Sequence, residues 1–388
     1  MTILRSDIIL RFGALGFKTL MTVFAPLYIG IELYGEVSFL TATSFQLSLL
    51  VGSGFAVVLT RERAQEKIQN KSFLATGLFL DLTIFFACVS FLFVFNVLEK
   101  NYLYFFLSLM TLTEIINTVL LRCNVSSGDT KLSNIHTSIR FISWPLVLVL
   151  VYTNFDTLLL TKFSYLVVVL NILTAIFIIK KTKIEVGPFV YSDISKLLFS
   201  QKYIITQYYI LYGLDLGFTI FLRSYLLLSL EANEFGQLMY CLAVLSIYDS
   251  VIDMMNAEFY KKIMNKVPLK IKSLFLSVGM IGIALFAIIA WYWIIGKVSY
   301  LDNIDKITVM AILFFTMIIK YFSFEAYLSV QSNRRDNTIL FAELSSFIFA
   351  IASMFIIGTG SIISALFIFI IQQNSRNLSM IYLHVKSS

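Results

Sequence analysis

The sequence predicts an all-α, polytopic membrane protein with about twelve transmembrane helices in two six-helix bundles. Composition is the first indication, since 59% of the 388 residues are hydrophobic, only 14% are charged and the mean hydropathy is +0.85. Such a chain has too little polar side-chain surface to cover a soluble globule. The second indication is that apolar runs of about 20 residues recur with little alternation, as spanning helices require. The third is an internal repeat.

The repeat divides the chain into halves. Each match is short for so apolar a sequence, and the common offset of 201 residues is what fixes the register. Duplicated helical bundles with a polar site at their seam are a recurrent architecture of transporters. The matching motifs are Leu15-Gly16-Phe17 with Leu216-Gly217-Phe218, Tyr34-Gly35-Glu36 with Phe235-Gly236-Gln237, and Lys71-Ser72 with Lys272-Ser273.

Turn and charge breaks between the apolar runs give the expected spans. Residues 1–180 are predicted to form the N-terminal bundle, residues 181–201 a cytoplasmic connector and residues 202–388 the C-terminal bundle. Six spans in each half make both halves begin on the same side of the membrane, so the repeat is parallel. The spans lie near residues 8–30, 37–60, 72–98, 102–122, 138–153, 157–179, 202–229, 237–260, 273–296, 307–330, 338–357 and 361–383.

The basic residues orient these spans. With a cytoplasmic N-terminus, most of the 30 lysines and arginines fall in cytoplasmic segments, including Arg122 and Arg140, whereas the opposite loops hold only Lys100, Lys297 and Lys306. This is the asymmetry of the positive-inside rule, and it places both termini in the cytoplasm. Topology thus accounts for the net charge of +7, and no basic, aromatic-rich motif indicates a nucleic-acid partner.

Several functional classes find no support in the residues. The chain has no phosphate loop, no nucleotide fingerprint and no soluble catalytic domain, so we expect neither an enzyme nor a cofactor. Cys88, Cys123 and Cys241 are scattered, and His136 lies far from His384, which makes a disulfide framework or a metal site improbable. We expect the cysteines to be packing residues.

Two cations interrupt the first span. At about 1.5 Å per residue across a core of about 30 Å, Lys18 falls near the centre of the bilayer. An unpaired ammonium there costs several kcal/mol, so Lys18 must face protein, water or a ligand. Arg11 lies seven residues earlier on the same face, where it either snorkels to the headgroups or takes part in function.

Carboxylates also lie within the spans, at Asp81, Asp215, Asp249 and Asp253. Asp249 and Asp253 are four residues apart on one helix face, where two carboxylates repel unless one is protonated or a cation bridges them. One interpretation is that interhelical ion pairs, such as Lys18 with Asp249, merely hold the bundles together. The other is a hydrated cavity at the seam, with carboxylates available for ion coupling and a cationic lining from Arg11, Lys18, Arg223 and Lys320.

Short motifs near helix ends carry a family resemblance. They are the run from Leu15-Gly16-Phe17 to Tyr34-Gly35-Glu36, the small residues Gly52-Ser53-Gly54-Phe55-Ala56 before Arg61-Glu62-Arg63, and Leu120-Leu121-Arg122 leading through Gly128-Asp129-Thr130-Lys131. In these features the chain resembles the Wzx-type polysaccharide flippases, in which an aromatic-glycine pair follows the first helix. Phe235-Gly236 repeats that turn in the second half. The likeness extends over nearly the whole chain in length and span count.

The resemblance implies the fold of the multidrug/oligosaccharidyl-lipid/polysaccharide exporter superfamily, with two bundles alternating between inward and outward opening. The implied cargo is an undecaprenyl-pyrophosphate-linked oligosaccharide, such as an O-antigen unit for lipopolysaccharide, crossing the bacterial inner membrane. The tail would stay in lipid while the sugar and pyrophosphate cross through the polar seam. A polysaccharide polymerase and a chain-length regulator are further implied partners.

Roles for the charged residues follow from this implied cargo. Arg11 and Lys18 are candidates for receiving the pyrophosphate, and Arg223 and Lys320 extend the cationic lining. Asp249 and Asp253 are candidates for proton or cation coupling. Asp81 and Asp215 are further candidates for that coupling.

Three alternatives stay open at this point. A drug or metabolite exporter of the same superfamily would use acidic residues and prefer cationic cargo, so the sign of the lumen discriminates it. A lipid-linked peptidoglycan precursor flippase is disfavoured because that relative usually carries two additional helices. An enzyme would require a carboxylate pair around a cleft at one membrane surface.

Overall fold

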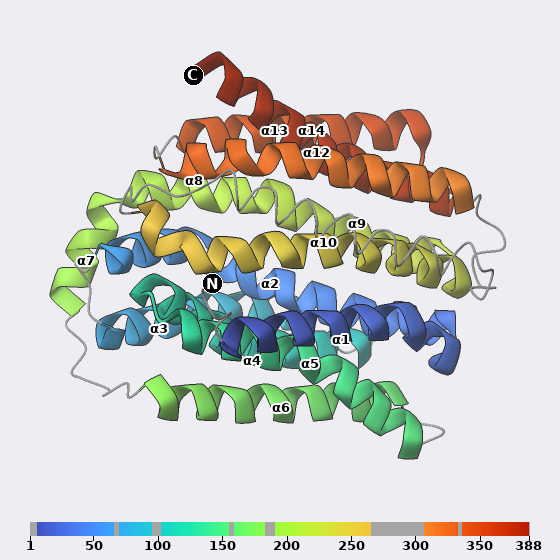
Figure 1. Cartoon of the computed structure of the whole chain (residues 1–388), viewed down its shortest axis with the longest axis horizontal. Coiled ribbons are helices and arrows are strands. Elements are labelled where there is room, and N and C mark those ends of the chain that lie inside the picture. The colour runs from blue at the N-terminus through green and yellow to red at the C-terminus, as the bar shows by residue number, and fades with distance from the viewer. Residues whose placement is uncertain are drawn as a thin grey trace. The chain divides into compact units, whose positions relative to one another are not determined.

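The helices begin and end close to the points where charged and turn residues interrupt the apolar runs. The computed structural model describes residues 6–65, 70–94, 102–154, 159–182, 191–264, 306–332 and 336–387. Every element within these ranges is a helix (Figure 1), which agrees with the predicted all-α architecture. The elements are α1 Ser6–Ile29, α2 Ile31–Ala64, α3 Asn70–Val94, α4 Tyr102–Ser127, α5 Thr130–Asn154, α6 Leu159–Thr182, α7 Tyr191–Ser200, α8 Lys202–Tyr212, the π-helical η1 Gly213–Gly217, α9 Phe218–Ser229, α10 Ala232–Met264, α12 Lys306–Ser332, α13 Asp336–Ile357 and α14 Ile362–Ser387.

Seven stretches of the described residues are long and apolar enough to cross a membrane. Shorter apolar stretches, Phe73–Val89 and Ala311–Ser323, mark α3 and α12. The predicted seventh span corresponds to α8, η1 and α9 together, and the predicted ninth span, near residues 273–296, lies outside the described residues. The seven are Leu10–Ile29, Ile31–Ala64, Leu103–Ser127, Thr130–Val151, Leu160–Thr182, Lys202–Ser229 and Asn337–Ile357.

Three of the described helices end at a glycine in the left-handed conformation, and these glycines are Gly30, Gly128 and Gly358. Gly30, at φ +82°, separates α1 from α2 and donates its backbone N–H to the carbonyl of Pro26. Gly128, at φ +80°, separates α4 from α5, and Asp129 then accepts the backbone N–H of Leu132 in the first turn of α5. A left-handed glycine ends a helix without steric cost, and an aspartate satisfies free amides at the start of the next.

Contacts divide the chain into two compact units. The first holds Met1–Met21 and Phe39–Leu216, and the second holds Thr22–Ser38 and Gly217–Ser388. The end of α1 and the start of α2 therefore belong to the second unit, and α8 and most of η1 belong to the first. The bundle boundaries near residues 180 and 202 express the sequence repeat, and they stay a prediction.

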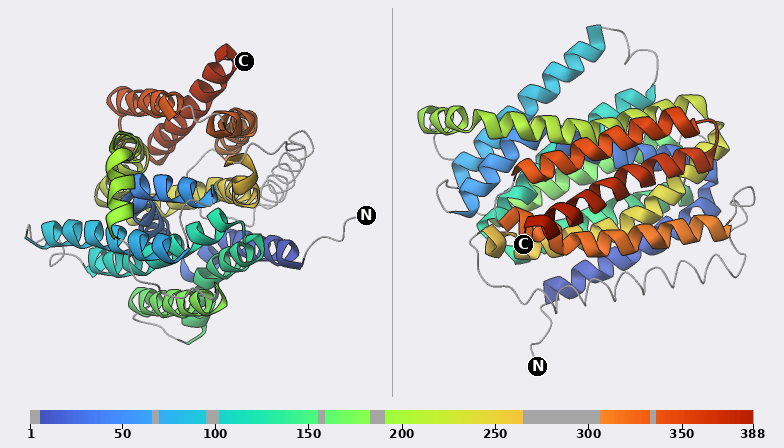
Figure 2. Two further views of the ribbon diagram at one scale, coloured as in Figure 1. Left: turned by 90° about the vertical axis from the view of Figure 1, so that its left-hand side faces the viewer. Right: turned by 90° about the horizontal axis from the view of Figure 1, so that it is seen from above.

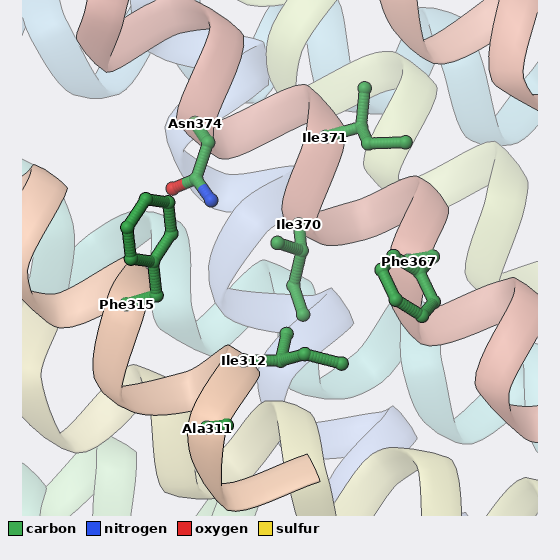
Figure 3. A pocket seen from close by; sticks show the side chains of 7 residues that line it. All are labelled: Ala311, Ile312, Phe315, Phe367, Ile370, Ile371 and Asn374. Atoms are coloured by element: carbon green, nitrogen blue, oxygen red, sulfur yellow. The ribbon is translucent and has the colours of Figure 1, made fainter. Parts of the chain in front are cut away.

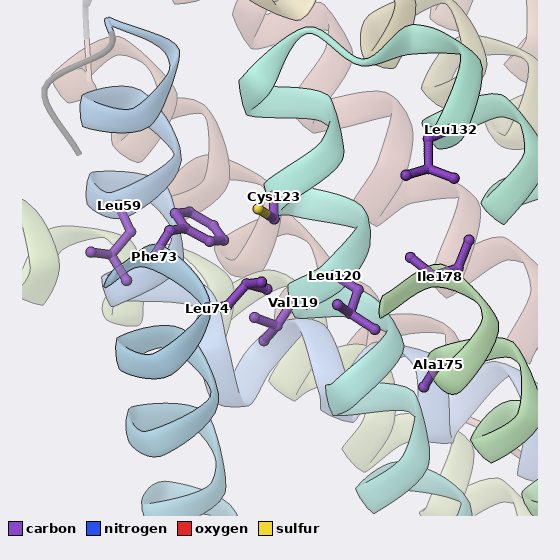
Figure 4. Packing of buried hydrophobic residues seen from close by; sticks show 9 residues of the cluster. All are labelled: Leu59, Phe73, Leu74, Val119, Leu120, Cys123, Leu132, Ala175 and Ile178. Carbon is purple, nitrogen blue, oxygen red and sulfur yellow. The ribbon is translucent and has the colours of Figure 1, made fainter. Parts of the chain in front are cut away.

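An apolar cluster forms the core of the first unit (Figure 4). Side chains from α2 to α6 meet in it, and α4 packs on α3 and α6, as does α5 on α6. Cys123 lies within this cluster, which agrees with the packing role expected of it. The members are Leu59, Phe73, Leu74, Val119, Leu120, Cys123, Leu132, Ala175 and Ile178.

The predicted connector contains a short helix, α7, which runs across the direction of α6 and α8 (Figure 1). Phe199 at its end is 72% exposed, and the ammonium of Lys202 lies 4.7 Å from the centre of the Phe199 ring. An exposed aromatic ring beside a lysine suits the boundary between lipid and water.

In the second unit, α14 packs along both α13 and α12 (Figure 1 and Figure 2). The repeat is also visible here, because Gly35 of α2 and Gly236 of α10, equivalent in the repeat, lie against each other. A Cβ on Gly35 would stand 2.8 Å from the Cα of Gly236. The Tyr34 ring meets Tyr240 edge-on with the centroids 6.1 Å apart. The aromatic-glycine motif is thus a helix-crossing point.

Candidate functional site

A partly buried ion pair lies between α4 and α5 in the first unit. Glu114 pairs with Arg140, and Asn171 of α6 donates to Glu114 Oε1 at 3.1 Å and to the hydroxyl of Thr113 at 3.2 Å. The guanidinium of Arg140 also lies 5.0 Å from the ring centre of Phe45 on α2. Both charges are therefore held by neighbours on several helices.

The same network continues along α4 toward α5. Asn117 donates to the backbone carbonyl of Asn171 at 2.9 Å, and its side-chain oxygen lies 3.1 Å from Nε2 of His136. His136 is fully buried, so it is an interior residue of this network rather than an exposed ligand. Among the described residues, no group of three histidine, cysteine or acidic side chains could hold a metal ion.

The two cations of α1 lie over α5 in matching register. Arg11, which is 3% exposed, donates to the amide oxygen of Asn134 at 2.5 Å, and the ammonium of Lys18 lies 4.9 Å from the ring centre of Phe141. Arg11 and Lys18 are seven residues apart on α1, and their partners Asn134 and Phe141 are seven residues apart on α5, which is about two helical turns in each case. The two helices therefore run parallel at this contact, as expected for the first and fifth of successive spans.

Asp81 lies beneath a glycine of α2. Its carboxylate is 3.7 Å from Nη1 of Arg122 on α4, and Asp81 is only 2% exposed. A Cβ at Gly52 would collide with the side chains of both residues. The missing side chain at Gly52 therefore lets the pair lie against the α2 backbone.

In the second unit, Lys320 of α12 donates to Asp249 of α10 at 2.6 Å. Their surroundings differ, because the side chain of Lys320 is 4% exposed and that of Asp249 is 43% exposed. Asp249 thus pairs with Lys320, whereas the sequence suggested Lys18 as an example. Asp253 lies further along α10, and its side chain is outside the described residues.

Arg223 of α9 is 9% exposed and lies 6.0 Å from the ring centre of Phe369 on α14. One turn earlier, the hydroxyl of Thr219 lies 3.4 Å from the side-chain oxygen of Gln372, also on α14. The side chain of Arg223 therefore extends from α9 toward α14. Asp215, half-buried, falls in the π-helical turn η1 before α9.

The helices that hold Arg122 and Arg140 extend beyond the predicted spans. The spans near residues 102–122 and 138–153 held the two arginines close to their cytoplasmic ends, whereas α4 continues to Ser127 and α5 begins at Thr130. The polar stretch between them resembles a loop in sequence. Its hydroxyls instead bond back to their own helix, as Ser126 does to the Cys123 carbonyl at 3.0 Å.

Sequence reasoning also missed the partners of several charges. Glu114 of α4 pairs with Arg140 of α5, and nothing in the sequence indicated that these two residues meet. In the second unit, Arg376 lies 3.5 Å from Glu343, and neither was singled out because both stand near predicted span ends.

Several solved transporter structures share this fold. The MATE multidrug transporter DinF-BH, solved as a complex, shares a TM-score of 0.68 and 15% identity over 98% of this chain and 93% of its own. A MOP superfamily transporter from Pyrococcus furiosus Vc1 gives a TM-score of 0.58 at 10% identity, over 100% and 98% of the two chains. The eukaryotic MATE transporter AtDTX14 gives 0.55 at 10% identity, over 97% and 92%.

In sequence, neither a family model nor a curated protein matches the chain. The structural likeness shows the fold, and the predicted all-α membrane protein of about twelve helices in two bundles is confirmed. The chain is thus a multi-pass membrane protein that shares the fold of these transporters.

Proposed function

We propose that this protein is a carrier that moves an undecaprenyl-pyrophosphate-linked oligosaccharide across the bacterial inner membrane by alternating access. The lipid tail stays in the bilayer, and the sugar and pyrophosphate cross along the polar interior. This proposal joins the transporter fold to the resemblance of the sequence to the Wzx-type flippases.

The observation that carries the proposal is the ion pair between Lys320 and Asp249. Lys320 lies in the middle of α12 with its ammonium buried, while its counter-ion keeps a side chain 43% exposed. An accessible carboxylate can be replaced as partner by another anion, whereas the lysine stays fixed. Burying a lysine within a membrane helix is costly, and such residues commonly mark a substrate or ion pathway.

The cationic side chains of the first unit also favour a cargo of negative charge. Arg11 is oriented by the amide oxygen of Asn134, and Lys18 lies over the ring of Phe141. A hydrogen bond to an amide oxygen and a contact with an aromatic face both orient a cationic side chain. We assign both residues to binding the pyrophosphate, with Arg223 and Lys320 in the second unit.

The polarity of the binding pocket varies within this fold. The transporter from Pyrococcus furiosus is described by a reversed polarity of its binding pocket, which suggested a different function for it. Proteins of similar structure can therefore differ in the charge that they receive, and the buried cations of this chain favour an anionic cargo.

A cation-coupled drug or metabolite exporter is the second candidate. The structural likeness to a multidrug transporter favours it, as does the exposed carboxylate of Asp249. In that case Asp249 would bind the cargo or the coupling ion directly, and Lys320 would only adjust the affinity of Asp249 for that ligand.

Reconstituted protein separates the two candidates. Proteoliposomes are loaded with undecaprenyl pyrophosphate carrying a short fluorescent glycan, and translocation is followed by quenching from outside. We expect Lys320→Gln to lower the rate at least tenfold and to leave the purified protein monodisperse. Lys162→Gln on α6, which replaces a lysine outside the proposed set, serves as the control and keeps the rate.

The competing result is equally concrete. If the wild type moves a cationic dye but not the lipid-linked glycan, and Asp249→Asn abolishes dye movement while Lys320→Gln does not, the exporter replaces the flippase.

A further inference from the structure

A groove between α12 and α14 has a volume of about 480 Å³ and lies in the second unit (Figure 3). Ile312 of α12 and Ile370 of α14 face one another across it, and Asn374 lies beside Phe315. Phe315 is 62% exposed, so the groove opens on the outer surface of these helices. The lining residues are Ala311, Ile312, Phe315, Phe367, Ile370, Ile371 and Asn374.

The polar end of the groove is defined by two hydrogen bonds. The hydroxyl of Thr316 donates to the Ile312 carbonyl at 2.9 Å, so its oxygen accepts the amide N–H of Asn374 at 3.3 Å. This contact identifies which end of the Asn374 amide is the nitrogen. The other end, the buried Oδ1 of Asn374, has no hydrogen-bond partner among the described residues.

One face of α12 changes from apolar to charged along its length. Ile312, Thr316 and Lys320 recur every fourth residue, so they share a face over about 12 Å. Thr316 and Lys320 are buried, and Lys320 reaches the accessible carboxylate of Asp249. This face of α12, which we call the strip, therefore begins at the apolar groove near Ile312, continues past the Thr316 hydroxyl and ends at the Lys320 ammonium.

We propose that this groove holds the first isoprene units of the cargo's polyprenyl tail while Lys320 binds its pyrophosphate. This inference rests on the proposed function and adds a tail-binding subsite to it. The order of polarity along α12 matches the order within the ligand, an apolar chain attached to a charged phosphate. The volume is that of a single small-ligand site, which suits one chain rather than the paired acyl chains of a phospholipid.

The direction of the strip agrees with uptake from the cytoplasmic leaflet. With the predicted orientation, α12 starts at the opposite surface, so the groove near Ile312 lies farther from the cytoplasm than Lys320. A lipid in the cytoplasmic leaflet has the same polarity, with its headgroup toward the cytoplasm and its tail toward the bilayer centre.

The test measures binding of polyprenyl pyrophosphates of increasing tail length to the full-length protein in nanodiscs. We expect the affinity of the wild type to rise about tenfold or more from two isoprene units to five. Ala311→Trp places an indole in the groove and should remove this gain without changing the affinity for the shortest tail. Phe314→Trp, on the same helix but not lining the groove, should keep it. Lys320→Gln should weaken all tail lengths by the same factor.

The outcomes separate the two proposals. A gain with tail length that persists in Ala311→Trp overturns the groove assignment and leaves the flippase intact. Absence of binding for every polyprenyl pyrophosphate overturns the flippase and the groove together. Equal competition by phosphatidylglycerol would show that the groove is a site for ordinary bilayer lipid, and this also overturns the assignment.

Discussion

Each compact unit holds an ion pair between its helices, but the pairs Glu114–Arg140 and Asp249–Lys320 are built differently. In the first unit, the side chains of Arg140 and Glu114 are 12% and 15% exposed, and Asn171 braces the carboxylate. In the second, Lys320 is 4% exposed and Asp249 is 43% exposed. The first pair is closed on both sides, so its role is to hold helices together. The second is open at its anion, so it can exchange partners.

Breaking the closed pair should have the largest effect. Glu114→Gln leaves the buried guanidinium of Arg140 without its carboxylate, and loss of one partner of a buried pair costs about 3–5 kcal/mol. We expect a large drop in the thermal unfolding midpoint in detergent and little recoverable protein.

A double variant controls for the charge itself. Glu114→Gln with Arg140→Gln removes both charges and should recover much of the lost stability. If the single variant melts like the wild type, the Glu114–Arg140 pair is not a structural brace, and the contrast between the units disappears.

Lys18 gives the next largest effect, on transport rather than on folding. Lys18→Ala removes a cation from the middle of α1 and leaves the Phe141 ring in place, so we expect membrane insertion without transport. Complementation of a flippase-deficient strain measures this, with Western blotting of the membrane fraction as the control. Normal complementation would remove Lys18 from the binding site.

Asp249→Asn should have a smaller, two-sided effect because its pair is open. Without the competing carboxylate, Lys320 holds an anion more tightly, so the apparent KM for the lipid-linked glycan should fall several-fold and turnover should fall with it. Stability should change less than in Glu114→Gln, since water or cargo can reach the freed ammonium. A raised KM would instead indicate that Asp249 contacts the cargo directly.

The sequence was sufficient for the fold and for the charged positions, but not for their pairing. Composition, spans and the repeat predicted the helical membrane architecture because spanning helices must satisfy their backbone internally. Partnership depends on contacts between helices. Asp249 pairs with Lys320, 71 residues away, and Glu114 pairs with Arg140, 26 residues away.

The repeat also shows that the sequence alone does not indicate which residues touch. The offset identified Gly35 and Gly236 as equivalent, yet nothing in one sequence indicates that equivalent glycines touch. They do so because neither has a side chain to hold the two helices apart.

Two glycine substitutions make the smallest changes and compare rigid with yielding contacts. A methyl group on Gly236 would meet the backbone carbonyl of Ile31, which cannot move without shifting a helix, so Gly236→Ala should cost about 1–3 kcal/mol.

A methyl group on Gly52 would meet the ends of the Asp81 and Arg122 side chains. These are the far ends of side chains, which can rotate away more easily than a backbone carbonyl can move. The helix propensity gained by alanine, about 0.5–1 kcal/mol, should offset the cost, leaving Gly52→Ala close to wild type in thermal unfolding. A loss at Gly52 as large as at Gly236 would show that Asp81 and Arg122 form a closed pair like Glu114 and Arg140.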